Sequence, residues 1–206
     1  MRGSICEANR RIRGFQKRFP SAQYSPVTSL EAEITQLKDQ LLRMAGMAES
    51  LVVRAVRALV DRDDDLARSV TAGDEPLDEL EKALDAASIV LLTKAPLAGQ
   101  LRLITVVIKI TGDLERIGDE STTIARRALE LGREPQLKPY QDIPKMSHMA
   151  TEMLRDALDA FVHGDTVKAR AVIPRDKAVD ALNRSLHQEL TQFMIQDPSN
   201  IGRCLH

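Results

Sequence analysis

Aromatic residues and cysteines are scarce in this sequence, and no long apolar run occurs. The 206 residues include 4 Phe, 2 Tyr, no Trp and 2 Cys, against 25 Leu and 23 Ala. Strands favour aromatic and β-branched residues, whereas Leu and Ala favour helices, so we expect an all-α protein. Cys6 and Cys204 lie near opposite ends, which excludes a disulfide scaffold and favours a reducing cytoplasm. Because no run approaches the roughly 18 apolar residues of a membrane span, we expect no direct membrane insertion.

An excess of one charge sign is confined to residues 1–28, which hold six basic residues and one acid. The remainder carries 23 basic and 29 acidic residues, a net charge of −6, which argues against nucleic acid as the main partner. The basic segment lacks the apolar core of a secretory signal. We interpret residues 1–28 as a leader without ordered structure; the alternative is an arm that binds nucleic acid or an anionic membrane.

Apolar residues spaced three and four positions apart predict long helices in the rest of the chain. Thr28 and Glu31 read as a capping box, and Asp63 as the N-cap of a second helix. Pro76, close to Gly73, predicts a kink or short break in that second helix. We expect helices over about residues 30–62, 63–94, 97–131, 145–163 and 165–196, with their ends near turns and prolines.

An internal repeat organises the chain. Residues 44–96 align without a gap on residues 146–198, an offset of 102, with 15 identities in 53 positions. The repeating unit is a helix, a kinked helix and a third helix, which predicts two tandem three-helix bundles. We assign residues 29–134 to the first bundle and 139–206 to the second. The counterpart of the third helix would begin near residue 199, so we expect the second bundle to be incomplete. Because its apolar faces would then be partly uncovered, we expect the protein to dimerise, to form a swapped assembly or to be poorly soluble.

Acidic pairs are the polar feature that the repeat preserves. Asp74 and Asp78 align with Asp176 and Asp180, although like charges four residues apart on a helix repel by roughly 0.2–0.5 kcal/mol. Helical spacing places Asp74 and Asp78 beside the core stripe. The third helix carries another pair, Glu115 and Asp119, which we expect to face solvent opposite a core stripe. That expected stripe consists of Leu103, Val106, Val107, Ile110, Leu114, Ile117 and Ile124.

These carboxylates are candidate metal ligands. Two pairs on adjacent helices supply four oxygen donors, which suit Fe, Zn, Mn or Mg ions. The alternative is a solvated acidic face, or pairing of the acids with Arg102, Lys109 and Arg116. No Gly-rich phosphate loop or nucleophilic triad is present to indicate an organic cofactor or an enzyme.

The string Leu-Glu-Arg-Ile-Gly-Asp over residues 114–119, with Leu101-Arg102 upstream, resembles the signature of the PhoU family. The resemblance extends over about residues 30–206. It implies two tandem three-helix bundles and surface metal binding through paired acidic motifs. The matching positions are Glu115 and Asp119 with Asp74 and Asp78, and Asp176 and Asp180 in the second half. By the offset of 102, a second Glu-Arg-Ile-Gly-Asp string would fall near 217–221, and it is absent from the 206 residues.

The same resemblance implies a cytoplasmic regulator without catalytic activity. Such a protein connects the ATPase subunit of the phosphate ABC transporter to a sensor histidine kinase, and holds the phosphate-starvation response off. Arg102 and Arg116 are the candidate partner-binding residues, and a homodimer is expected. Two alternatives remain: a metal-free structural adaptor, or a di-iron carboxylate protein. The second needs Glu-x-x-His motifs facing a bundle core, and no Glu here is followed three positions later by His.

Overall fold

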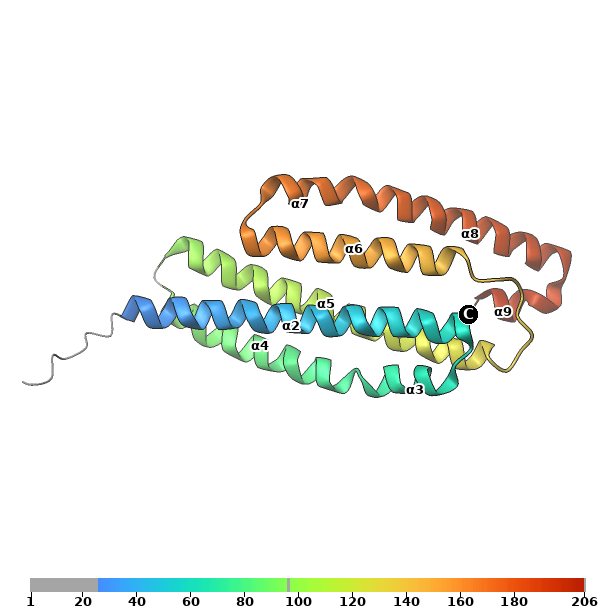
Figure 1. The fold of residues 1–206 in the computed structure, drawn as a ribbon, viewed down its shortest axis with the longest axis horizontal. Helices are drawn as coiled ribbons and strands as arrows, with labels where there is room; N and C mark the ends of the chain where they lie inside the picture. Colours follow the sequence, from blue (N-terminus) through green and yellow to red (C-terminus); the bar gives the residue numbers. More distant parts are fainter. Residues whose placement is uncertain (1–25, 96, 206) are drawn as a thin grey trace, which may run out of the picture.

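The computed structural model describes residues 26–95 and 97–205, and this part of the chain is helical without any strand, which confirms the all-α prediction. Figure 1 shows the helices side by side as long, nearly parallel rods. In chain order they are α2 (Pro26–Asp61), α3 (Asp64–Ala72), α4 (Glu75–Lys94), α5 (Ala98–Leu131), α6 (Asp142–His163), α7 (Thr166–Val172), η1 (Ile173–Arg175), α8 (Asp176–Gln196), η2 (Pro198–Asn200) and α9 (Ile201–Leu205).

The start of α2 corrects two expectations. The helix begins at Pro26, so Thr28 lies inside it rather than at the predicted N-cap position. Proline suits the first helical position because its fixed φ is already helical and its missing N–H has no helical partner there. Residues 26–28, which the sequence assigns to the leader, are therefore part of α2, while residues 1–25 lie outside the described residues.

Helices α2 to α5 enclose the main hydrophobic core. Its largest fully buried side chains include Leu41 and Met44 of α2, Leu77 and Leu84 of α4, and Leu114 of α5. The predicted break in the second helix is confirmed, because α3 ends at Ala72 and α4 begins at Glu75 with Pro76 in its first turn. Asp63 also caps α3 as predicted: its side chain accepts a 2.9 Å hydrogen bond from the backbone N–H of Leu66.

The buried face of α5 differs from the predicted stripe. Val107 and Leu114 are buried as expected, but the other residues of the predicted stripe are only half-buried: Leu103, Val106, Ile110, Ile117 and Ile124. The fully covered face instead runs through small residues, among them Thr111, Gly118, Ser121 and Ala125. Small side chains let α5 approach its neighbours closely, a preference that hydrophobic spacing cannot report.

Helices α6 to α9 form a second layer. Figure 1 shows α8 outermost, with α6 between it and the first four helices. Helix α6 packs on α2, and α8 packs on α6. Neither α7 nor α8 contains a buried residue, whereas α4 buries four. Among the described helices, none has the length and apolar content that would let it cross a membrane.

Candidate metal and partner surface

The first acidic pair lies at the break between α3 and α4. Asp74 precedes the first residue of α4, and its carbonyl accepts a 3.0 Å hydrogen bond from the N–H of Asp78. The amino end of a helix favours negative charge, because its first N–H groups have no helical acceptor. Both acids are half-buried beside the core, as the sequence predicted. The break in the helix therefore presents two carboxylates, one turn apart, at an end that tolerates them.

Gly118 brings the second acidic pair against the first. A Cβ atom built on Gly118 would lie 2.3 Å from Cδ2 of Leu77 and 2.9 Å from Oδ1 of Asp74. Only a residue without a side chain allows this approach of α5 to the start of α4. Glu115 and Asp119, three residues before and one residue after Gly118, are thereby held beside Asp74. The glycine in the Glu-Arg-Ile-Gly-Asp string thus has a packing role that positions the acids around it.

The charges of the two pairs act on one another. Burial raises the pKa of Asp74, the charges of Asp78 and Asp119 raise it further, and Arg126 opposes the rise. Burial likewise raises the pKa of Glu115, followed by the charges of Asp119, Glu81, Asp78 and Asp74. We use the name acidic surface for these five residues: Asp74, Asp78, Glu81, Glu115 and Asp119.

The structure brings four of the six candidate ligands predicted from the sequence into this surface: Asp74, Asp78, Glu115 and Asp119. Glu81 was missed, although it follows Asp78 by three positions and so lies on the same helix face. Glu115 is half-buried rather than solvent-facing, because the buried face of α5 lies closer to it than the predicted stripe. Asp119 is exposed, as expected.

The oxygen donors of the acidic surface suit a cation, but the side chains that carry them are not arranged as a ligand set. Oδ1 of Asp74 is buried near Gly118 without a hydrogen-bond partner, and the charges of Asp119 and Glu115 lie close to this carboxylate. Hard divalent cations accept such oxygen donors. Across residues 26–95 and 97–205, however, no three His, Cys, Asp or Glu side chains converge as a ligand set. A cation site on this surface would therefore require its exposed side chains to rotate toward one another.

Asp176 and Asp180 do not belong to this surface. Both are exposed on α8 in the second layer, and Asp180 lies 3.8 Å from the guanidinium of Arg184. The two arginines proposed for partner binding are exposed on α5. Arg116 borders a hollow between α5 and α6, while Arg102 lies near the amino end of the helix.

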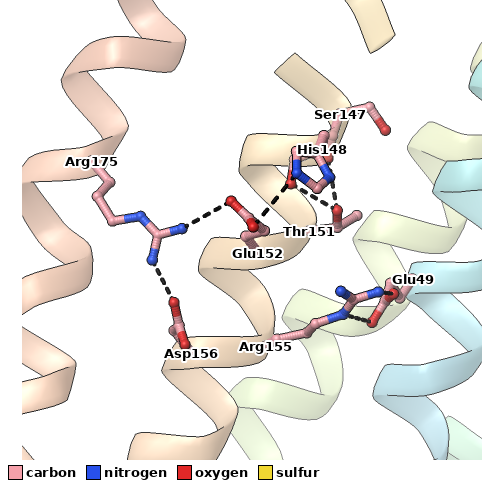
Figure 2. A network of polar contacts seen from close by, with 8 residues as sticks. All are labelled: Glu49, Ser147, His148, Thr151, Glu152, Arg155, Asp156 and Arg175. Carbon is pink, nitrogen blue, oxygen red and sulfur yellow. Dashed lines mark hydrogen bonds and ion pairs between the residues drawn. The ribbon is translucent and has the colours of Figure 1, made fainter. Parts of the chain in front are cut away.

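A second polar cluster, which sequence reasoning missed, joins the two layers (Figure 2). Nε of Arg155 on α6 donates to Glu49 of α2 at 2.8 Å, and a second nitrogen of the same guanidinium donates to the other carboxylate oxygen. This paired contact lowers the pKa of Glu49. Arg175 of η1 contacts Glu152 and Asp156 of α6, which ties the start of α8 to the same helix. No spacing rule pairs residues 106 positions apart, so only the fold reveals this cluster.

Comparisons with known proteins agree with this architecture. The family model described as PhoU domain matches residues 41–128 and again 143–205, one match in each layer. A phosphate-specific transport system accessory protein PhoU homolog from Aquifex aeolicus is 39% identical over 175 residues, 84% of this chain and 79% of that protein. The homolog from Pseudomonas aeruginosa is 36% identical over 85% of this chain and 73% of its own length.

Solved structures extend the likeness to three dimensions. The crystal structure of PhoU from Pseudomonas aeruginosa has a TM-score of 0.81 at 36% identity, and 85% of each chain is covered. The phosphate transport system regulatory protein PhoU from Streptococcus pneumoniae has a TM-score of 0.77 at 25% identity, with 82% of this chain and 80% of that chain covered. The domain matches in both layers and the shared fold place the protein in a known group, and the chain belongs to the PhoU family.

Proposed function

We propose that this protein is a non-catalytic regulator of phosphate uptake that acts in the cytoplasm. In this role it binds the ATPase subunit of a phosphate ABC transporter and a sensor histidine kinase, and keeps the phosphate-starvation response off when phosphate is plentiful. The observation that carries the proposal is the family match in both layers, 41–128 and 143–205. The printed names of the relatives, accessory and regulatory proteins of phosphate transport, support it.

The surfaces of the molecule suit an adaptor. Long helices expose charged residues over much of their length, and Arg102 and Arg116 on α5 are available to acidic partners. A helix face of this kind is a common recognition element for partner proteins. We also propose that the protein forms a homodimer, which would double the number of partner sites.

Expression of the chain in a bacterium whose own PhoU-family gene is deleted tests the regulatory role. With phosphate in excess, a phosphate-starvation reporter should fall to the repressed level when the chain is present and stay high with the empty vector. Affinity capture of purified transporter ATPase subunit and kinase cytoplasmic domain then tests contact directly. A reporter that stays high, together with capture of neither partner, would refute the proposal.

We further propose that the acidic surface binds one or more Fe, Zn, Mn or Mg ions. The unpartnered Oδ1 of Asp74 and the raised pKa values of Asp74 and Glu115 support this, because a cation would relieve the repulsion among the acids. The exposed position of Asp119 favours such a surface site over a di-iron site buried in a bundle core.

Isothermal titration with each divalent ion, on protein first stripped with chelator, tests the metal proposal. The double variant Glu115→Gln/Asp119→Asn should lose near-stoichiometric binding. The matched control Asp176→Asn/Asp180→Asn also removes two negative charges, but from the second layer, and should retain near-stoichiometric binding. Equal binding by both variants would mean that the ions are held elsewhere, and the acidic surface would then be a solvated face of a metal-free adaptor.

A further inference from the structure

The outer face of the second layer exposes apolar side chains where the first layer exposes polar ones. Val167 of α7, Ile173 of η1 and Ile195 of α8 have exposed fractions of 79%, 70% and 68%. The offset of 102 aligns them with three exposed polar residues of the first layer: Asp65, Thr71 and Thr93. Single apolar residues are common on protein surfaces, so these three become informative only through the charges that lie among them.

The exposure of this face does not depend on a covering third helix. In the first layer, α5 packs on both α3 and α4, and the residues at the matched outer positions are still exposed. On α8, Lys177 and Arg184 each lie two residues before a half-buried apolar residue, Val179 and Leu186 respectively. Two residues correspond to about 200° around a helix, so the two cations lie on the side of α8 opposite its half-buried residues.

Three cations lie along this outer face. Arg170, Lys177 and Arg184 are exposed and follow one another at intervals of seven residues. Among the residues that the structure describes, Arg170 and Lys177 form no ion pair, and Arg184 lies 3.8 Å from Asp180. The positive charge of this face is therefore largely uncompensated by neighbouring acids.

The matched face of the first layer is acidic, and its cations are paired. Arg68 lies 3.4 Å from Asp65, and Lys82 lies 2.9 Å from Glu79. Residues 61–94 include four basic and ten acidic residues, whereas residues 163–196 include five basic and four acidic ones. The cations on the outer face of the second layer thus remain available to an acidic partner, while those of the first layer already have acidic neighbours.

The spacing of the three cations fits a partner helix better than a flat surface. Residues seven apart on an α-helix lie almost in line, about two turns from one another. Helices α7, η1 and α8 follow without a break from Thr166 to Gln196, and Figure 1 shows α7 and α8 along the outer edge of the molecule. A helix laid alongside would meet each cation at the same seven-residue interval, whereas a lipid surface has no such register. We use the name outer ridge for six residues: Val167, Arg170, Ile173, Lys177, Arg184 and Ile195.

We propose that the outer ridge binds an acidic amphipathic helix of a partner protein. The partner's carboxylates lie opposite Arg170, Lys177 and Arg184, and its apolar side chains cover Ile173 and Ile195. Complementary charge gives such a contact its orientation and specificity, and the exposed isoleucines supply apolar area. This inference rests on the adaptor role proposed above and names the chemistry of one partner contact, at a surface separate from the arginines of α5.

Charge reversal tests the outer ridge against a matched face of the same protein. The variant Arg170→Glu/Lys177→Glu/Arg184→Glu should weaken binding of the purified transporter ATPase subunit, or of the purified kinase cytoplasmic domain, by about 10-fold or more. The control Arg68→Glu/Lys82→Glu reverses the charge at the matched positions of the first layer and should leave both affinities unchanged. Circular dichroism checks that both variants keep their helices.

A conservative variant of Lys177 tests for direct contact with an acid. Carbodiimide joins an amine to a carboxylate that touches it, so the original chain should cross-link through Nζ of Lys177 to an Asp or Glu of the partner. Lys177→Arg keeps the positive charge and should keep the affinity, but the cross-link should disappear. Mass spectrometry of the cross-linked peptides identifies the partner segment and shows whether its acids recur at seven-residue spacing.

Two kinds of failure are distinguishable. If the original chain binds neither partner, the adaptor role is refuted and this inference is refuted with it. If the charge-reversed chain binds as tightly as the original, or if Lys177 cross-links to neither partner, only the outer ridge proposal is overturned. Flotation with phosphatidylglycerol vesicles examines the remaining source of negative charge: vesicle binding that the reversal abolishes, with unchanged affinity for both proteins, would show that the ridge meets a membrane surface instead.

Discussion

The two layers have related sequences, but only the first has a closed core. In the first layer, α5 lies against both α2 and α4, and a continuous set of Leu, Val and Ala side chains is buried. In the second layer, α8 packs on α6, and residues of the same type remain half-exposed. Burial is thus a property of the neighbouring helix as much as of the residue. Hydrophobic stabilisation follows the area removed from water, so equal residues in the two layers contribute unequally.

The largest expected difference comes from truncating matched leucines. Leu84→Ala should lower the free energy of unfolding by about 2–5 kcal/mol, because it leaves a cavity in a closed core. Leu186→Ala should cost only about 1 kcal/mol, since that side chain is only partly buried and its loss leaves no closed cavity. Urea denaturation of both variants measures the difference. Equal losses would contradict the comparison and indicate that the second layer is covered in solution.

Two glycines of α5 provide the next test. Gly118→Ala should destabilise the protein by about 1–3 kcal/mol, because the added methyl group overlaps Leu77 and Asp74. Gly112→Ala meets nothing within 4 Å and should stabilise it by about 0.5–1 kcal/mol through helix propensity. Thermal unfolding, monitored by circular dichroism, shows whether each variant is more or less stable than the original chain. Stabilisation by Gly118→Ala would mean that α5 and α4 are farther apart than described.

The turn before each second helix offers a smaller contrast. Gly164 and Arg62 occupy matched positions and both adopt the left-handed conformation, with φ of 66° and 55°. Gly164→Ala should therefore cost about 1 kcal/mol. Arg62→Gly relieves the same strain but removes hydrogen bonds to the carbonyls of Leu131 and Gly132, so we expect a net change near zero. The control Arg62→Ala keeps the strain, loses the bonds, and should be the less stable of the two in urea.

Charge neutralisation should give the smallest effects, with opposite signs in the two polar clusters. Glu115 has a raised pKa, so the native state holds its proton more readily than the unfolded chain, and the cost of its charge disappears as pH falls through the raised pKa. Glu115→Gln should therefore stabilise the protein at pH 7 by about 0.2–0.5 kcal/mol and change little at pH 3.

Glu49 behaves in the reverse way. Arg155 lowers the pKa of Glu49 in the folded protein. The stabilisation from this contact is therefore present at pH values above the pKa of Glu49 in the unfolded chain, and it is lost as the pH falls through the pKa in the folded state. Glu49→Gln should destabilise the protein at pH 7 by about 0.2–1 kcal/mol, an effect that fades in acid. Urea denaturation across pH 3–7 measures both. The same sign for Glu115→Gln and Glu49→Gln at pH 7 would contradict the assignment of repulsion to one cluster and attraction to the other.

Local patterns in the sequence determined the helices, their breaks and the acidic pairs. Helix propensity, the N-cap at Asp63 and the break near Pro76 act within a few residues, so spacing along the chain reports them. The repeat pointed to Asp74 and Asp78 for a similar reason: a preserved pair of like charges at adjacent turns is costly and calls for an explanation. The family followed from the same strings, together with the residues around Gly118.

Only the tertiary structure decided which residues those helices bring together. It set the buried face of α5, because close packing favours Thr, Gly, Ser and Ala over the Ile residues that a hydrophobic pattern selects. It joined Glu81 to the acidic surface, paired Glu49 with Arg155, and left Leu186 half-exposed where Leu84 is buried. These outcomes depend on contacts between helices far apart in the chain, and burial, charge and pKa are fixed by those contacts rather than by the residue alone.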